Sequence, residues 1–386
     1  MTYSVEMFAK MFTKQQRHTS YCEALRRTIK QGDVVIDIGT GIGVYAMEAA
    51  RLGARKVFAV EPNPLVRLGP ALAAANGFAP DHIEFYEMFS TEFEPPEQAD
   101  VIFADLRGRT PLYAGNVPAL YDAATRLLKP GGVLIPQRDL VSAALVACPS
   151  GGSEWWDHWN GNPFGFDLSP ALELQMSRVL AAAVRSEQML SAPELVADIR
   201  YGVDPVVDIV HHWRTEATAD GTVAGIASWF DGTLVPGVTV SNGPHVPPSV
   251  YGGAFLGFTE PFAVRTHEQI EVGLNVRFVG GEYEWSWSAG RVDDSGHVRQ
   301  RSVGSSLLGT PMTPRSLALL HDDRTVESTA RLQADALGLR LLAAGSSVGE
   351  VADRLHSEFP ETFPTRVEGK DAAVGLANAY GHLGRV

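Results

Sequence analysis

The sequence predicts an α/β domain built on a parallel sheet, followed by an antiparallel β-barrel domain and a small helical module. Three observations carry this prediction. Between residues 33 and 138, apolar strand-like runs alternate with helical or loop stretches of crossover length. Between 139 and 309, short β-rich segments are separated by Gly, Pro and Asn turns. From 310 to 386, apolar residues recur at helical spacing.

The first part of the chain is predicted to begin with helices, after which strands and helices alternate. Residues 1–32 are predicted to be helical, because apolar side chains such as Met11, Tyr21 and Leu25 recur at helical spacing. Strands of the parallel sheet are predicted at 34–38, 57–61, 83–86, 100–104 and 133–135. Ligands of such sheets bind beyond the carboxyl ends of the strands, where Gly39, Glu61 and Asp105 are expected to cluster.

The second part is predicted to be antiparallel, with one helical interruption. Strands are predicted at 140–147, 205–214, 223–230, 252–258, 270–278 and 282–288. A helix is expected over 169–186, with Ser169 and Pro170 as its N-cap and first residue. Helices are also expected over 325–345, 347–358 and 370–383, with Ser347 and Glu350 forming a capping box.

Composition limits the possible partners. The chain has 386 residues and a net charge of −13, which argues against nucleic acid as the main partner. The two cysteines, Cys22 and Cys148, form no CxxC motif, so no disulfide framework is expected and a reducing cytoplasm fits. No signal peptide is visible, and no apolar run approaches the length of a membrane span.

The most informative motif is a strand, a glycine turn and a second strand that ends in an acid. Val34-Val35-Ile36-Asp37-Ile38 is followed by glycines at 39, 41 and 43, and Glu61 closes the next apolar run. The glycines let the backbone approach a nucleoside, and Glu61 can accept hydrogen bonds from two ribose hydroxyls. The Gly-Thr-Gly-Ile-Gly spacing and the preceding Asp37 favour S-adenosylmethionine (SAM) over a dinucleotide or a purely structural turn.

Further motifs resemble the protein arginine methyltransferases from about residue 5 to about 290. The run Met11-Phe12-Thr13-Lys14-Gln15-Gln16-Arg17-His18-Thr19-Ser20-Tyr21 is similar to the helix that clamps SAM in that family. The run 35–43 matches the family's motif I, and 54–61 looks like its second strand. Leu128-Lys129-Pro130-Gly131-Gly132, Pro136-Gln137-Arg138, Phe164-Gly165-Phe166-Asp167-Leu168-Ser169, Trp229-Phe230-Asp231 and Gly243-Pro244-His245 follow in the family's order.

The resemblance implies a fold and a set of cofactor residues. The fold is a Rossmann-like SAM-binding domain at 33–138, preceded by clamping helices at 1–32, and a β-barrel domain at 139–309 with a helical dimerisation insertion at about 169–190. The module at 310–386 lies outside the family pattern. Arg17 corresponds to the residue that binds the SAM carboxylate, Asp37 and Gly39 to contacts of its amino-acid part, and Glu61 to the ribose anchor. The expected cofactor set is Met11, Arg17, Asp37, Gly39, Thr40, Gly41, Gly43, Glu61, Pro62, Met88, Phe89 and Asp105.

The acceptor loop departs from the family pattern. Arginine methyltransferases hold a guanidinium between two glutamates nine residues apart; here Asp105 takes the first position and Ala114 the second. Arg107 and Arg109 enter this loop, where they would repel a guanidinium and favour an acceptor with a carboxylate. The family's Thr-His-Trp loop reads Ser249-Val250-Tyr251. Protein arginine methylation is therefore disfavoured.

The expected catalytic residues are Asp105, as base or anchor, with His245 and Tyr251 orienting the acceptor. The clusters Trp155-Trp156-Asp157-His158-Trp159 and His211-His212-Trp213 fit packing better than metal binding, and no metal site is expected. The run 341–355 loosely resembles winged-helix domains that recognise precursor peptides in peptide natural-product pathways, although a plain helical appendage or dimerisation element is favoured.

These observations predict a cytoplasmic, homodimeric methyltransferase that uses SAM and releases S-adenosylhomocysteine. Its acceptor is expected to be a nitrogen of a small molecule, an amino acid or a peptide in a biosynthetic pathway, without nucleic acid or membrane partners. Three alternatives stay open: O-methylation of a carboxylate or hydroxyl, protein arginine methylation with a non-standard loop, and a non-catalytic SAM-binding scaffold.

Overall fold

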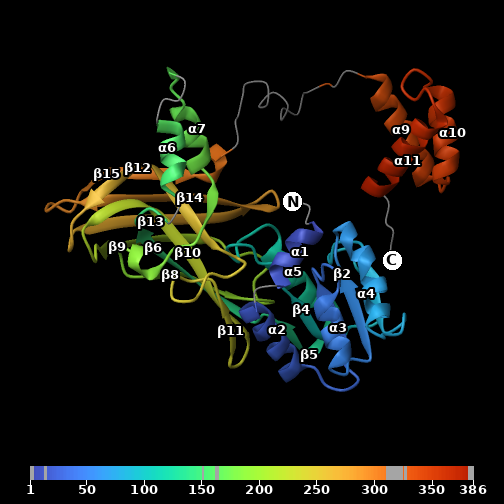
Figure 1. Cartoon of the computed structure of the whole chain (residues 1–386), viewed down its shortest axis with the longest axis horizontal. Coiled ribbons are helices and arrows are strands. Elements are labelled where there is room, and N and C mark those ends of the chain that lie inside the picture. Colours follow the sequence, from blue (N-terminus) through green and yellow to red (C-terminus); the bar gives the residue numbers. More distant parts are fainter. Residues whose placement is uncertain are drawn as a thin grey trace. The chain divides into compact units, whose positions relative to one another are not determined.

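A computed structural model describes residues 4–12, 15–149, 152–160, 165–309, 325 and 328–380. The chain divides into two compact units (Figure 1). The first contains the described residues up to 309 except Tyr86–Met88, and the second contains Tyr86–Met88 and the described residues from 325 onward. Each unit is described separately below. The predicted domain boundaries at 33, 139 and 310 stay predictions.

The parallel sheet has the strand order β3-β2-β1-β4-β5. Its strands are β1 (Val34–Ile38), β2 (Lys56–Val60), β3 (Ile83–Tyr86), β4 (Ala99–Ala104) and β5 (Leu128–Ile135). β1 is buried along its whole length and pairs in parallel with β2 and β4. Because β1 and β4 run in the same direction, the segments that follow Ile38 and Ala104 leave the sheet at the same edge. This edge is where the glycine turn and Asp105 lie.

Among the described residues, α-helices precede this sheet or connect its strands. They are α1 (Val5–Phe12), α2 (Gln15–Thr28), α3 (Val44–Arg51), α4 (Gly69–Ala75) and α5 (Asn116–Asp122). α2 buries Tyr21 and Leu25 completely, which confirms the predicted helical face of the N-terminal segment. The prediction placed the start of the last strand at 133, but β5 begins at Leu128. The Leu128-Lys129-Pro130-Gly131-Gly132 motif therefore lies inside β5, where Leu128 pairs with Ala99 and an irregularity follows.

The antiparallel part forms two sheets. Their strands are β6 (Arg138–Val146), β7 (Val179–Ala182), β8 (Glu194–Arg200), β9 (Ile209–Glu216), β10 (Gly221–Val235), β11 (Val238–Ser241), β12 (Gly253–Val264), β13 (Gln269–Val279), β14 (Glu282–Val292) and β15 (Val298–Ser305). One sheet has the order β7-β12-β10-β6-β8 with β11 on β10, and the other has the order β15-β14-β13-β9. The predicted combination of a parallel α/β domain with an antiparallel β domain is confirmed.

The helical interruption of this domain differs from the prediction. The helix expected over 169–186 ends at Met176, its N-cap is Leu168 rather than Ser169, and residues 179–182 form β7. Leucine and alanine in that segment favour helix, but pairing with β12 overrides this preference. A second helix, α6 (Ser153–Asn160), was not predicted, and it packs against α7 (Ser169–Met176) (Figure 1).

The tryptophans of α6 serve packing, as predicted. Trp156 is buried in a cluster with Leu172, Met176 and Phe255, and its indole N–H donates to the carbonyl of Phe258 at 3.1 Å. Phe164 of the quoted barrel motif lies outside the described residues.

The C-terminal helices form a small core of their own. They are α9 (Ala330–Ala343), α10 (Val348–Glu358) and α11 (Arg366–Tyr380). The buried residues Ala334, Val351, Leu355, Phe363 and Ala373 form this core. The predicted capping box is confirmed: the Ser347 N–H donates to Glu350 Oε2 at 2.8 Å, and the Glu350 N–H donates to Ser347 Oγ at 3.3 Å.

Candidate functional site

The glycine turn after β1 forms one wall of the site. Gly41 has φ +60°, in the left-handed region that glycine favours, and its N–H donates to Glu61 Oε2 at 3.0 Å. At Gly39, a Cβ would lie 2.5 Å from Leu106 Cδ2, in the loop after β4. The cofactor turn and the predicted acceptor loop are therefore in direct contact, and glycine at position 39 permits this approach.

Asp37 offers a buried carboxylate oxygen beside the turn. The side chain is 1% exposed, and Thr40 Oγ1 donates to its Oδ2 at 2.6 Å. Its Oδ1 has no hydrogen-bond partner in the described part of the structure. Burial raises the pKa of Asp37 to about 7, against the opposing hydrogen bond from Thr40. An orphaned, ionisable oxygen at this position suits the α-amino group of SAM.

Glu61 lies directly after β2 and faces the glycine turn. The Asn63 N–H donates to its Oε1 at 2.9 Å, and Gly41 donates to its Oε2. Burial raises the pKa of Glu61, although both N–H donors favour the charged form. Each carboxylate oxygen keeps a lone pair free, as a ribose diol requires. The residues present therefore fit SAM.

Binding of S-adenosylhomocysteine, which carries the same α-amino group, is expected to weaken as the pH falls. The pKa of Asp37 is about 7, so its carboxylate is mostly protonated at pH 6 and mostly ionised at pH 7.5. Only the ionised form attracts the ammonium group, so affinity should rise roughly tenfold over this interval. Calorimetric titrations across this range measure the effect. Asp37→Asn should give weak binding at every pH, and a flat profile in the unmodified protein would contradict the assignment.

Arg17, Asp105 and Tyr251 form one buried cluster. Arg17 Nε donates to Asp105 Oδ2 at 2.7 Å and to the Tyr251 hydroxyl at 3.1 Å, and Arg17 Nη2 also bonds Asp105 Oδ2. The Tyr251 hydroxyl donates to Asp105 Oδ2 at 2.7 Å. Burial opposes ionisation of Asp105, but the charges of Arg17 and Arg107 outweigh it and hold the pKa of that carboxyl below its ordinary value. Asp105 is therefore an anion at neutral pH.

Arg107 does not face an acceptor, contrary to the sequence-based expectation. Its side chain is 0% exposed, and its Nη1 lies 2.8 Å from Oδ1 of Asp139, which is also fully buried. Its Nε lies 3.5 Å from Asp105 Oδ1, and its Nη2 donates to the Tyr21 hydroxyl. The guanidinium also lies over the Phe230 ring, 5.0 Å from its centroid. Arg107 is an internal cation that joins the acceptor loop to β6.

Asn242 joins three segments of the site. Its Nδ2 donates to the carbonyl of Arg109 at 2.8 Å and to that of Gly252 at 2.6 Å, and its Oδ1 accepts from the Phe230 N–H at 2.8 Å. The acceptor loop, strand β10 and the loop that carries Tyr251 are therefore held by one amide.

The remaining predicted residues lie in different surroundings. His245 is on the surface, where its Nε2 lies 3.0 Å from Asp231 Oδ1, and no described contact joins it to the Asp105 cluster. Phe89 is 61% exposed, so it has no core role. Met11 on α1 is half-buried, and Pro62 after β2 is exposed. Met88 belongs to the segment Tyr86–Met88 of the second unit, and its place relative to the turn stays a prediction.

Four residues of the site were not predicted from the sequence: Tyr21, Asp139, Asn242 and Tyr45, whose hydroxyl accepts from Arg17 Nη1 at 3.2 Å. Tyr21 lies four positions after Arg17, on the same face of a helix, and this spacing could have indicated it. Asp139 is an acid in a mostly apolar strand, which is a signal for a buried partner. Nothing in the local sequence indicates Asn242, because its partners lie up to 133 residues away.

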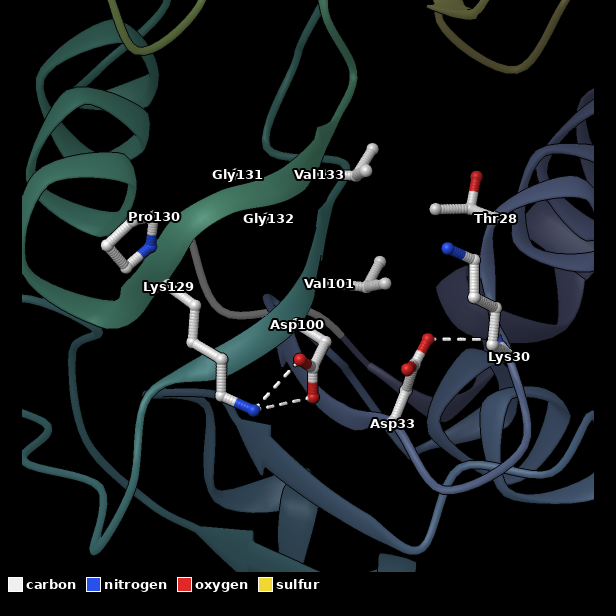
Figure 2. Close-up of a pocket in the computed structure, with 10 residues that line it drawn as sticks. All are labelled: Thr28, Lys30, Asp33, Asp100, Val101, Lys129, Pro130, Gly131, Gly132 and Val133. Carbon is white, nitrogen blue, oxygen red and sulfur yellow. Dashed lines mark hydrogen bonds and ion pairs between the residues drawn. The ribbon is translucent and has the colours of Figure 1, made fainter.

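A separate hollow lies at the other edge of the parallel sheet (Figure 2). It has a volume of about 170 Å³ and is lined by Thr28, Lys30, Asp33, Asp100, Val101, Lys129, Pro130, Gly131, Gly132 and Val133. Both oxygens of Asp100 lie 2.8 Å from the Lys129 ammonium group, and Asp33 accepts from the Lys30 N–H at 2.8 Å. These acids are satisfied internally and lie at the amino ends of the strands, so the hollow is not the cofactor site.

Comparison with known proteins gives a consistent picture. The family model of the ribosomal protein L11 methyltransferase (PrmA) matches residues 15–137. A probable protein arginine N-methyltransferase 6 from Arabidopsis thaliana is 25% identical over 59% of this chain, and the match spans 54% of that relative. An arginine N(omega)-methyltransferase from Streptomyces achromogenes subsp. streptozoticus is 29% identical over 68% of this chain and 74% of its own length.

Solved structures share the fold. Arabidopsis thaliana protein arginine methyltransferase 10 matches with a TM-score of 0.66 and 20% identity, over 78% of this chain and 98% of its own. The Trypanosoma brucei PRMT1 enzyme-prozyme heterotetrameric complex with AdoHcy matches with a TM-score of 0.68 and 21% identity, over 77% and 97%. The chain is similar to the arginine methyltransferases, and these matches support a class I methyltransferase with SAM as its cofactor.

The described residues contain no candidate metal site and no candidate membrane-spanning helix. Within those residues, no three His, Cys, Asp or Glu side chains gather in a way that could hold a metal ion. No helix there has the length and apolar character needed to span a membrane.

Proposed function

We propose that the protein transfers the methyl group of SAM to a nitrogen atom of a small molecule, an amino acid or a peptide in a biosynthetic pathway. The observation that carries this proposal is the single acceptor-side acid. Asp105 is ionised and buried beside Arg17 and Tyr251, while the position of the second acid is occupied by Ala114. Ala114 is half-buried with φ +43°, so the loop turns there without offering a second carboxylate.

Each residue has a distinct role in this proposal. Arg17, Asp37 and Glu61 hold the carboxylate, the amino group and the ribose of SAM, with Met11, Gly39, Thr40, Gly41, Gly43, Pro62, Met88 and Phe89 completing the cofactor site. Bound SAM supplies a methyl group that is activated by its sulfonium, for direct in-line displacement. Asp105 stabilises the positive charge that develops on the acceptor nitrogen, and Tyr251 holds the orientation of Asp105.

A small acceptor is supported by the name of one relative and by one side chain. The Streptomyces relative is named for methylation of arginine, without reference to a protein. In the described structure the Arg109 guanidinium has no ion-pair partner, whereas Arg107 is paired internally. Arg109 therefore remains available to a carboxylate of the acceptor, which is a feature of free amino acids and peptide C-termini.

The other candidate functions are favoured by particular observations. Several relatives are named as protein arginine N-methyltransferases, which favours a protein acceptor. Partial loss of the acid pair favours a non-catalytic scaffold. O-methylation is a rival because an in-line displacement does not require a nitrogen. His245 pairs with Asp231 on the surface, and a role in acceptor orientation would place the acceptor over β10 and β11.

A homodimer in the cytoplasm also belongs to the proposal. α7 lies within the range expected for the family's dimerisation insertion, about 169–190, and Phe166 just before it is 67% exposed. An exposed large apolar side chain at such a position suits a contact between copies. The net charge of −13 speaks against nucleic acid partners.

Transfer of label from methyl-labelled SAM tests the proposed function. The purified protein is incubated with an extract of its own source, and labelled products are separated by size and identified by mass spectrometry. We expect label in small molecules or peptides, and none with Glu61→Ala, which should lose SAM binding because the ribose anchor is removed. Label confined to arginine residues of proteins would favour protein arginine methylation instead. Unchanged SAM affinity in the Glu61→Ala protein would exclude the proposed cofactor site.

A further inference from the structure

We propose that Arg107 sets the charge of the acceptor site, so that the acceptor presents an uncharged nitrogen rather than a guanidinium cation. This inference rests on the proposed function, because it assumes a nitrogen acceptor beside Asp105. It goes further by naming the charge class of that acceptor and the residue that selects it. The acceptor classes that fit are free-base amines, amides and heteroaromatic nitrogens.

The Arg107 guanidinium is held in one position by its neighbours. It lies between two carboxylates, with Nη1 2.8 Å from Asp139 Oδ1 and Nε 3.5 Å from Asp105 Oδ1. The Tyr21 hydroxyl accepts from its Nη2, and the Phe230 ring covers one face. A cation held on all these sides has no freedom to turn toward a ligand. It acts as a fixed charge next to Asp105.

Asp139, the partner of Arg107, is itself held in place by hydrogen bonds. The Tyr201 hydroxyl donates to Asp139 Oδ2 at 2.6 Å, and Asn116 Nδ2 donates to the Tyr201 hydroxyl at 3.3 Å. Asn116 Nδ2 also donates to the carbonyl of Pro111, in the acceptor loop, at 2.8 Å. The ion pair is thus anchored at both ends, in β6 and at the start of α5.

The charges of the buried side chains around Asp105 cancel. Arg17 and Arg107 carry two positive charges, and Asp105 and Asp139 carry two negative charges, so this buried group is neutral. Burial raises the pKa of Tyr21, Tyr201 and Tyr251, so their hydroxyls add no charge. A guanidinium acceptor would add an unbalanced positive charge near Arg107, and like charges at such a site exclude a ligand. An uncharged nitrogen adds none.

The reaction itself creates a positive charge on the acceptor nitrogen. The lone pair of an uncharged nitrogen would form the bond to the methyl carbon while the carbon–sulfur bond of SAM breaks and S-adenosylhomocysteine leaves. The nitrogen would then be positive and would release its proton to water. Asp105 Oδ1 is buried and has no hydrogen-bond partner in the described residues, so it can accept a hydrogen bond from that nitrogen. The carboxylate then favours the transition state over the bound acceptor, which is the condition for catalysis.

Binding of L-arginine and L-citrulline tests the inference, because the two differ in the charge of the side-chain head group and little in shape. Both are titrated calorimetrically into the full chain saturated with S-adenosylhomocysteine. The unmodified protein should bind arginine no more tightly than citrulline. Arg107→Met removes the fixed cation and leaves two carboxylates against one guanidinium in this buried group, so its arginine affinity should rise at least about tenfold while its citrulline affinity changes little. R107M/D139N removes one charge of each sign, so the group stays neutral and neither affinity should rise. Tighter arginine than citrulline binding by the unmodified protein overturns the inference, and so does the absence of a gain in the Arg107→Met protein.

Two controls keep the result decisive. Arg107→Gln is a second variant without the cation, used if Arg107→Met fails to bind S-adenosylhomocysteine. R55M/E97Q removes an exposed Arg–Glu pair from the same domain and should change neither affinity. Failure of the proposed function gives a different result. Methyl-labelled SAM then labels no nitrogen, although the Arg107→Met protein still binds arginine more tightly than the unmodified protein does. Methylation of arginine by the unmodified protein instead overturns this inference and leaves nitrogen methylation standing.

Discussion

Asp105→Asn is expected to lower the rate of methyl transfer by about 100-fold or more. Asn has the same shape, but it removes the charge that Arg17, Arg107 and Tyr251 surround. A neutral amide cannot stabilise the positive charge that develops on the acceptor nitrogen. The initial rate of label transfer to the acceptor found with the unmodified protein measures the effect.

The control for this substitution is Asp198→Asn. Asp198 pairs with Arg138 on the surface of the barrel domain, and its loss should leave the rate unchanged. Binding of S-adenosylhomocysteine to the Asp105→Asn protein is measured in parallel, to show that the cofactor site persists. Equal rates for the Asp105→Asn and unmodified proteins would exclude Asp105 from the reaction and point to a different acceptor position.

Arg107→Met alone is expected to destabilise the protein by about 3–5 kcal/mol at neutral pH. Asp139 is fully buried and would lose the cation that faces it, keeping only the hydrogen bond from Tyr201. An unpaired carboxylate at this depth is costly because no water replaces the lost partner. The midpoint of thermal unfolding of the full chain measures the loss.

The pH dependence and a double variant distinguish this cause from lost packing. Burial already raises the pKa of Asp139, and removal of Arg107 should raise it further. A carboxyl whose pKa is raised on folding costs stability once the pH exceeds its unfolded value of about 3.9, so acidification to about pH 5 should recover part of the loss. R107M/D139N should recover most of it at neutral pH. A deficit in Arg107→Met that is independent of pH would indicate packing instead.

The cofactor half of the site could be predicted from the sequence because its signals are local. Asp37, Gly39 and Gly41 lie within one turn, and Glu61 follows the next strand of a βαβ unit. The alternation of apolar runs was enough to locate strands of the parallel sheet along the chain, because buried parallel strands are apolar along their length.

The acceptor half could not be predicted in the same way because its partners are distant in sequence. The local sequence gives no sign that Arg107 is buried, because its partner Asp139 lies 32 residues away in β6. Asn242 meets Arg109 only after the barrel strands have formed. The short strand β7 was missed for a related reason: its residues favour a helix, and only pairing with β12 makes them extended.

The most direct test of this account is the position of a ¹³C-methyl group transferred from labelled SAM. The labelled product of the unmodified protein is isolated and examined by NMR, with the Asp105→Asn protein as the background. We expect a methyl group bonded to nitrogen, on an acceptor whose nitrogen was uncharged before transfer. A methyl group on oxygen or on a guanidinium, or no labelled product above the background, would contradict it.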